Sequence, residues 1–260
     1  MTLATSNSEV PILEMRGLAL PRLTSGLLAT PGMDWSVRAG EFWVVGGLLG
    51  SGKTDLLSTA AGLLPPSEGE LQLLGRSVKS LTADDRLSLQ LRVGLVHDGG
   101  RLLRHLSVAE NIALPLRYHH NATLADVSRR VEAWIEATQL QAVATQASGR
   151  ISRNWATRAG LARACVLEPE ILLVDNPLSG LDPQHVHWWL DCLQQISEGH
   201  PLLGYRRRTL IVTCDDFQPW FRAGRRFGVL TSSGFRVMDR PDSADQLEAA
   251  LMETKGEKRN

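Results

Sequence analysis

The sequence has no excess of charge of either sign, because 28 Lys and Arg residues balance 28 Asp and Glu residues over 260 positions. A chain without net charge produces no overall field that would attract nucleic acid or an anionic membrane surface. Charged partners must therefore bind at local sites, and we do not expect nucleic acid among them.

Long apolar runs and a secretion signal are also missing. No apolar stretch approaches the roughly 20 residues that span a bilayer. The first ten residues, MTLATSNSEV, are polar and lack a basic lead before an apolar core. We therefore expect a cytoplasmic protein, for which any role at a membrane must come through a partner.

Cysteine is scarce, and its spacing excludes the usual frameworks. The three cysteines, Cys165, Cys192 and Cys214, are odd in number and form no C-x-x-C pair. This pattern predicts reduced, buried thiols and neither a set of disulfides nor a zinc site.

What the sequence does contain is a series of short apolar runs separated by helical stretches. Such a pattern is typical of an α/β fold with a mostly parallel sheet whose two faces are both covered. The predicted strands lie at 42–45, 92–96, 171–174, 209–213 and 227–230, and a further strand is predicted between the Pro65-Pro66 turn and Gly75.

The stretch from 107 to 167 has a helical pattern instead. Apolar residues recur there at spacings of three and four, as in an amphipathic helix that contains Val127, Val131 and Trp134. We expect one domain over 11–240, with a core at about 11–97 and 166–240 and a helical subdomain at about 98–165. The remaining residues, 241–260, are predicted to form a C-terminal helix and a charged tail.

The segment GLLGSGKT, residues 47–54, matches the phosphate-binding P-loop pattern between a predicted strand and a predicted helix. Glycines let backbone N–H groups converge on phosphate oxygens, and the following helix presents its positive end to them. Lys53 is expected to bridge the β and γ phosphates of ATP. The expected nucleotide-binding residues are Gly47, Gly50, Ser51, Gly52, Lys53, Thr54 and Asp55.

A magnesium site is predicted beside this loop. The hydroxyl of Thr54 is one expected ligand, and Asp175, at the end of the apolar run ILLV, is the second. The cofactors that we expect are therefore ATP and Mg²⁺.

Four segments together resemble the nucleotide-binding domain of ATP-binding cassette (ABC) transporters. They are GLLGSGKT at 47–54, SVAENIALPL at 107–116, LARACVLEPEILLVD at 161–175 and LSGLDP at 178–183. The resemblance implies a RecA-like P-loop core with an inserted helical subdomain that contacts integral membrane permease subunits. It also implies a second nucleotide-binding domain, from a homodimer or a heterodimer, that meets the first head to tail and encloses each ATP. The segment 95–116 is similar to the ATPases of lipid-asymmetry and Mce-type lipid importers.

Several positions depart from the pattern of that family, while Asp182 in LSGLDP keeps it. Asn176 stands where the family places the glutamate that polarises the attacking water. An amide cannot accept a proton at neutral pH, so general-base help worth roughly 10² to 10⁴ in rate is predicted to be missing. The family's glutamine falls on Asp98, and its γ-phosphate-contacting histidine falls on Cys214.

The signature sequence of the family, whose helix meets the γ phosphate across the dimer, falls on ISRNW at 151–155. Only Ser152 matches it. Arg153 and Asn154 replace two glycines, and one hypothesis is that Arg153 supplies a compensating charge to the phosphate. Asp55 follows the P-loop at a position where the family has a hydroxyl. Because like charges about 4 Å apart repel by roughly 4 kcal/mol at an effective dielectric of about 20, Asp55 must turn away or weaken binding.

We interpret the chain as an ATP-binding transporter subunit that is impaired in hydrolysis and acts as a structural or regulatory cassette. A first alternative is a working ATPase that energises transport, with lipids as a candidate cargo, in which Asp98, Asp215 or Asp216 replaces the missing base. A second is an ABC protein outside transport that acts on DNA or ribosomes. Because the base and the signature are both altered in one chain, pairing it with an intact cassette would impair both composite sites.

One basic cluster, YRRR at 205–208, lies outside these motifs. We expect its side chains to be solvated. A contact with a membrane surface or an acidic partner is the alternative.

Overall fold

The structure is a computed structural model that describes residues 10–21, 32–231, 233–239 and 241–252. Its centre is a six-stranded sheet with the strand order β10-β9-β3-β8-β7-β6. The strands β9, β3, β8, β7 and β6 are parallel to one another, and only β10 is antiparallel to its neighbour. Their bounds are β3 Phe42–Gly47, β6 Val93–Val96, β7 Ile171–Val174, β8 Thr209–Cys214, β9 Arg226–Thr231 and β10 Gly234–Met238. The α/β fold class and the five strand positions expected from the sequence are confirmed, with small shifts of their ends.

The parallel strands are buried on both faces, which explains why they read as continuous apolar runs. In β3, Phe42 and Val44 face one hydrophobic core, and Trp43 and Val45 face another. Side chains alternate between the two faces of a strand, so neighbouring residues enter different cores. This sheet therefore lies between two hydrophobic cores, which fix the positions of its strands.

A second sheet is antiparallel and has the order β2-β1-β4-β5, and of its strands only β4, after the Pro65-Pro66 turn, was predicted from the sequence. Its strands are β1 Leu13–Ala19, β2 Met33–Val37, β4 Glu68–Leu73 and β5 Arg76–Ser77. In β2 the buried residues Met33, Trp35 and Val37 alternate with exposed ones. Strands with only one covered face lack the continuous apolar run that marks a parallel strand, which explains why β1, β2 and β5 were not predicted.

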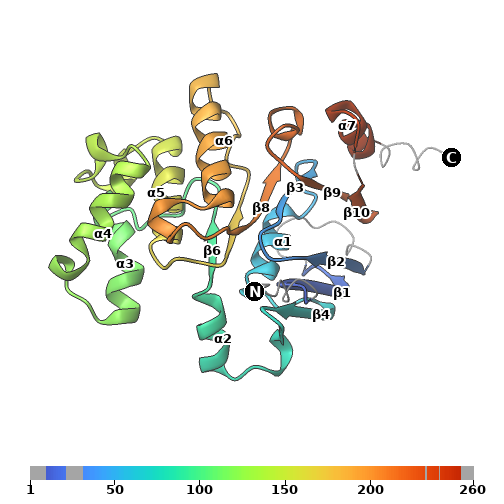
Figure 1. Cartoon of the computed structure of the whole chain (residues 1–260), viewed down its shortest axis with the longest axis horizontal. Coiled ribbons are helices and arrows are strands. Elements are labelled where there is room, and N and C mark those ends of the chain that lie inside the picture. Colours follow the sequence, from blue (N-terminus) through green and yellow to red (C-terminus); the bar gives the residue numbers. More distant parts are fainter. Residues whose placement is uncertain (1–9, 22–31, 232, 240, 253–260) are drawn as a thin grey trace, which may run out of the picture.

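Three of the α-helices form a group of their own. Figure 1 shows α3, α4 and α5 gathered at one end of the molecule, away from the antiparallel sheet, which lies at the other end. The α-helices are α1 Lys53–Ala60, α2 Ala83–Gln90, α3 Val108–His120, α4 Leu124–Ala137, α5 Arg153–Cys165, α6 Pro183–Glu198 and α7 Ala244–Met252. Short 3₁₀ helices occupy Val78–Ser80, Gln141–Val143, Ser148–Arg150, Pro201–Leu203 and Gln218–Trp220. Among the helices that the structure describes, none combines the length and the apolar character needed to cross a membrane.

Local capping explains where the helical group begins. Ser107 accepts a hydrogen bond from the Glu110 backbone, and the Glu110 carboxylate accepts one from the Ser107 backbone. Thr123 and Asp126 form the same reciprocal arrangement at the start of α4. Such capping boxes satisfy N–H groups that a helix start leaves without partners. They fix the start of α3 and α4, the two helices that precede α5.

Candidate nucleotide-binding site

The loop between β3 and α1 has the backbone shape that a phosphate cradle requires. Gly50 and Gly52 have φ values of 81° and 96°, in the left-handed region that favours glycine. A Cβ atom on Gly47 would lie 2.3 Å from the Ser51 hydroxyl and 2.9 Å from the Leu230 carbonyl oxygen. These positions therefore require glycine for conformational or steric reasons, as the sequence pattern predicted.

Two observations show that the loop fits an anion. The Ser51 hydroxyl is buried and has no hydrogen-bond partner within the described part of the chain. Helix α1 begins at Lys53 with Gly52 as its N-cap and without a capping side chain. Its first N–H groups and its positive end therefore face the loop, and a phosphate group would satisfy both them and Ser51.

Lys53 is held within the loop by three oxygen atoms. Its ammonium group donates to the carbonyl oxygens of Gly47 and Leu48 at 2.5 and 3.0 Å. It also forms an ion pair of 2.9 Å with the carboxylate of Asp215. The side chain of Lys53 is 9% exposed, and that of Asp215 is 44% exposed. A carboxylate from the end of β8 is therefore bound to the lysine that was predicted to bind phosphate.

The two expected magnesium ligands lie together. Thr54 donates its hydroxyl to one carboxylate oxygen of Asp175 at 2.7 Å, and Thr213 donates to the other at 2.8 Å. Asp175 is 4% exposed. Mg²⁺ commonly binds through one or two carboxylates together with waters and substrate phosphates. The pair of Thr54 and Asp175 fits this role, and the described residues hold no group of three or more His, Cys, Asp or Glu side chains that would form an all-protein metal site.

Asn176 lies beside Asp175 and is tied to the next strand. Its backbone N–H donates to the Thr213 hydroxyl at 3.1 Å, and its side-chain amide donates to Asp215 at 2.7 Å. The amide therefore acts as a donor to the carboxylate that also holds Lys53. Sequence reasoning considered Asp215 only as a substitute base, although the carboxyl ends of neighbouring parallel strands meet at one edge and offered a signal for this contact.

Two further residues that depart from the family pattern contact each other in the structure. Arg153, the first residue of α5, forms an ion pair with Asp98 of the same chain. Their side chains are 52% and 44% exposed. Ser152 is the N-cap of α5 and makes no side-chain cap bond, and the Asn154 side-chain oxygen is buried without a partner among the described residues. In this chain Arg153 therefore neutralises Asp98.

These positions surround a small cavity of about 240 Å³. The cavity brings together the predicted signature, glutamine and base positions of one chain. It is lined by Asp98, Ser152, Arg153, Asn154, Thr157, Asn176, Pro177, Ser179, Gly180 and Leu181.

Three further predicted residues, Cys214, Asp182 and Asp55, do not line this cavity. Cys214 ends β8 and is 2% exposed, and burial raises the pKa of its thiol, which keeps the thiol neutral. Asp182 caps α6 and accepts hydrogen bonds from the backbone and ring nitrogens of His185, which hold its pKa below the usual value. Asp55 is buried in the first turn of α1. The resemblance to the family would place an adenine-stacking aromatic in LALPRLTSG, residues 18–26, which contains no aromatic residue, and residues 22–26 lie outside the described part of the chain.

Comparisons with known proteins agree on a family. The family model described as ABC transporter matches residues 31–179. The chain is 31% identical over 191 residues to the methionine import ATP-binding protein MetN 1 of Acinetobacter baylyi, covering 73% of this chain and 53% of that protein. It is 29% identical over 166 residues to the intermembrane phospholipid transport system ATP-binding protein MlaF of Haemophilus influenzae, covering 64% of this chain and 63% of that protein. The chain thus spans little more than half the length of these curated relatives.

The fold matches solved structures. The dimeric post-hydrolysis structure of the ATP-binding cassette MJ0796 bound to ADP and Pi superposes with a TM-score of 0.77 at 21% identity. The match covers 88% of this chain and 99% of that one. At this identity the similarity shows the fold, a cassette with a mostly parallel sheet and a helical subdomain.

Proposed function

Because this chain belongs to the ABC transporter family, we propose that it is the ATP-binding subunit of a membrane transporter and hydrolyses ATP slowly or not at all. The observation that carries the second part is the contact between Asn176 and Asp215. The residue at the position of the base donates a hydrogen bond to a carboxylate, so its amide is engaged as a donor and has no basic atom for water.

The binding half of the site supports the first part. The loop residues from Gly47 to Gly52 would hold the phosphates of ATP through backbone N–H groups and the Ser51 hydroxyl. Lys53 would exchange Asp215 for phosphate oxygens, and Thr54 and Asp175 would contact Mg²⁺. Bound Mg²⁺ would supply positive charge that neutralises the phosphates. Binding of ATP would therefore change the contacts of Lys53, Thr54 and Asp175 even if the bond to the γ phosphate is not cleaved.

A working ATPase with a substitute base is the rival hypothesis, and three carboxylates were its candidates. Asp98 is paired with Arg153, and Asp215 is bound by Lys53 and Asn176. Asp216 accepts a hydrogen bond from the Gln218 backbone and also contacts Glu248. Each candidate already has a partner, which favours the hydrolysis-impaired cassette over the rival.

We propose that the partners are integral membrane permease subunits and a second nucleotide-binding domain, which would place the chain on the cytoplasmic face of the membrane. The name of MlaF states phospholipid transport, which supports a lipid as the cargo. MJ0796, a cassette of the same fold, is dimeric, which supports pairing of two cassettes. Co-purification with an integral membrane protein would support this assignment, whereas co-purification with nucleic acid would support an ABC protein outside transport.

Equilibrium binding of ATP with Mg²⁺ to the purified chain tests the binding half. Loss of a charged hydrogen-bond donor is worth about 1.5 to 3 kcal/mol, so Lys53→Ala should weaken binding roughly 10- to 100-fold. Lys79→Ala is the matched control, because Lys79 is exposed and lies outside the site. Equal affinity of the two variants would contradict the proposed role of Lys53.

A further inference from the structure

A second cavity, of about 580 Å³, lies at the opposite edge of the six-stranded sheet from the phosphate loop. Gly40 precedes β3, Glu170 precedes β7 and Thr209 begins β8, so the cavity is at the amino-terminal ends of these parallel strands. The phosphate loop follows the carboxyl end of β3. The cavity lining comprises Ile12, Ala39, Gly40, Glu168, Glu170, Leu203, Gly204, Arg206, Arg207, Arg208 and Thr209.

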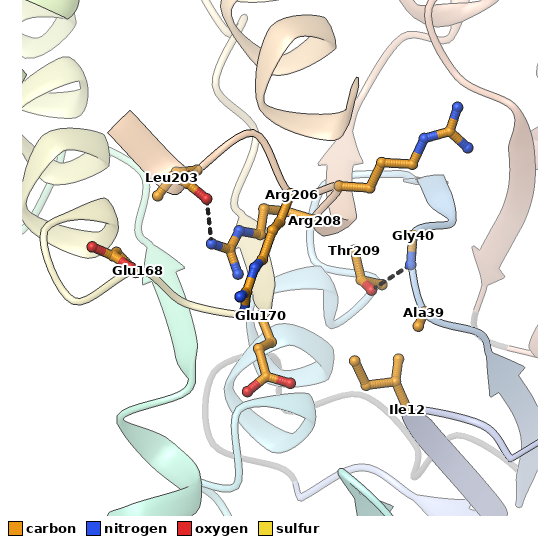
Figure 2. A pocket seen from close by; sticks show the side chains of 11 residues that line it. Ile12, Ala39, Gly40, Glu168, Glu170, Leu203, Arg206, Arg208 and Thr209 are labelled. Carbon is orange, nitrogen blue, oxygen red and sulfur yellow. Dashed lines mark hydrogen bonds between the residues drawn. The ribbon is translucent and has the colours of Figure 1, made fainter. Parts of the chain in front are cut away.

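Three consecutive arginines line this cavity, and one of them is buried. Arg208 is 6% exposed, and its guanidinium donates to the Leu203 carbonyl oxygen at 2.7 Å. Its Nε atom is buried and has no hydrogen-bond partner among the described residues. The expectation that the whole cluster is solvated is therefore wrong for Arg208. The exposed Arg206 lies beside Arg208, between Leu203 and Glu170 (Figure 2).

The acids of the cavity do not neutralise these arginines. Glu170 forms two hydrogen bonds with Arg92, at 2.5 and 2.9 Å. Glu168 pairs with Arg130 at 2.5 Å. Within the described part of the chain, Arg206, Arg207 and Arg208 form no ion pair. The cavity therefore holds three cationic side chains whose charge is left without a carboxylate partner.

We propose that this cavity binds the phosphate group of a phosphorylated ligand. The planar guanidinium group matches phosphate oxygens in a two-pronged geometry. A buried N–H group without a partner is unfavourable, and an anion entering the cavity would supply the missing acceptor for Arg208. Ile12 and Leu203 add an apolar wall against which the rest of the ligand would pack. This site is independent of the ATP site, because it lies at the other edge of the sheet and shares no residue with it.

Calorimetric titration with pyrophosphate tests the proposal on the full chain. The background is Lys53→Ala, which weakens phosphate binding at the P-loop, so the remaining event reports on the cavity. Arg206→Gln combined with Arg207→Gln removes two exposed charges and leaves the buried Arg208 in place, which protects folding. Arg222→Gln is the matched control, because Arg222 is an exposed arginine outside the cavity.

We expect the Lys53→Ala protein to bind pyrophosphate. The variant that also carries Arg206→Gln and Arg207→Gln should bind it at least about tenfold more weakly. The Arg222→Gln control should bind it as the Lys53→Ala protein does. A parallel arm measures co-sedimentation with phosphatidylcholine vesicles that contain phosphatidic acid, against phosphatidylcholine alone. Arginine-dependent binding in the first arm identifies a soluble phosphate, and such binding in the vesicle arm alone identifies a lipid headgroup. The proposal is overturned if neither probe binds, or if the Arg222 variant weakens binding equally.

Discussion

The two halves of the candidate nucleotide site differ in how their polar groups are satisfied. On the phosphate side, Ser51 has no hydrogen-bond partner among the described residues, and α1 begins without a capping side chain. On the water side, two residues that depart from the family pattern are bound by groups of the same chain: Asn176 by Asp215, and Asp98 by Arg153. One half contains a hydroxyl and a helix start that an anion would satisfy, although its Lys53 is paired with Asp215, whereas in the other half Asn176 and Asp98 are held by internal contacts.

Under the proposed function, nucleotide binding and nucleotide turnover would be separable in this chain. Three of the departures meet a complementary group, since the Asn176 amide donates to Asp215 and the Arg153 guanidinium pairs with Asp98. A glutamate at position 176 would place a second negative charge beside Asp215. The residues at positions 176, 98 and 153 are therefore each paired with a group of the same chain that complements them.

The largest expected effect concerns the phosphate side. Asp175 is buried and accepts hydrogen bonds from Thr54 and Thr213. If it contacts Mg²⁺, Asp175→Asn should remove roughly 10- to 100-fold of the gain in ATP affinity that Mg²⁺ provides. The measurement compares dissociation constants with Mg²⁺ and with a chelator, and Asp191→Asn, an exposed residue of α6, is the control. An unchanged Mg²⁺ effect in Asp175→Asn would contradict the predicted metal role.

The next effect tests the pair on the water side. Asn176→Glu should destabilise the fold by about 1 to 3 kcal/mol, because it replaces a hydrogen bond by repulsion between two carboxylates. Combining it with Asp215→Asn restores a donor and an acceptor and should recover most of the loss. Urea unfolding of the wild type, both single variants and the double variant gives the coupling free energy directly. Additive single effects would show that the contact contributes nothing.

A smaller effect links the two halves through Lys53. Asp215 is 44% exposed, and ion pairs at such positions are worth about 0.2 to 1 kcal/mol. Asp215→Asn removes a carboxylate that phosphate must displace, so ATP should bind up to about fivefold more tightly. Weaker binding of ATP by this variant would instead show that Asp215 supports the nucleotide.

The smallest effect belongs to the pair of Asp98 and Arg153, whose side chains are about half exposed. Its coupling free energy in a double-mutant cycle with Asp98→Asn and Arg153→Gln should be about 0.2 to 1 kcal/mol and should fall as salt rises. A coupling that does not respond to salt would mean that packing and not charge joins the two residues.

The sequence predicted the parts of the molecule that depend on local pattern. The strand at 171–174 could be predicted because an apolar run that is buried on both faces is recognisable from the sequence by itself. The P-loop was recognisable because glycines at fixed spacing are required by its backbone shape. Three strands of the antiparallel sheet were missed because strands such as β2 bury one face only.

Contacts between distant segments were not predicted. Asn176 and Asp215 are 39 positions apart, and Asp98 and Arg153 are 55 apart. Their pairing depends on how the strands and α5 are placed, which residue types alone do not specify. The burial of Arg208 was missed for the same reason, since the sequence shows only three neighbouring arginines.

Single-turnover hydrolysis is the measurement that tests the central claim most directly. Excess protein is mixed with limiting labelled ATP and Mg²⁺, equilibrium binding is confirmed, and the formation of ADP is followed over time. We predict that ATP is bound and that ADP forms slowly or not at all. Formation of ADP by the wild type at the rate of an ordinary ATPase, about 1 s⁻¹ or faster, which Lys53→Ala abolishes, would contradict this prediction and would mean that a group other than residue 176 activates the water.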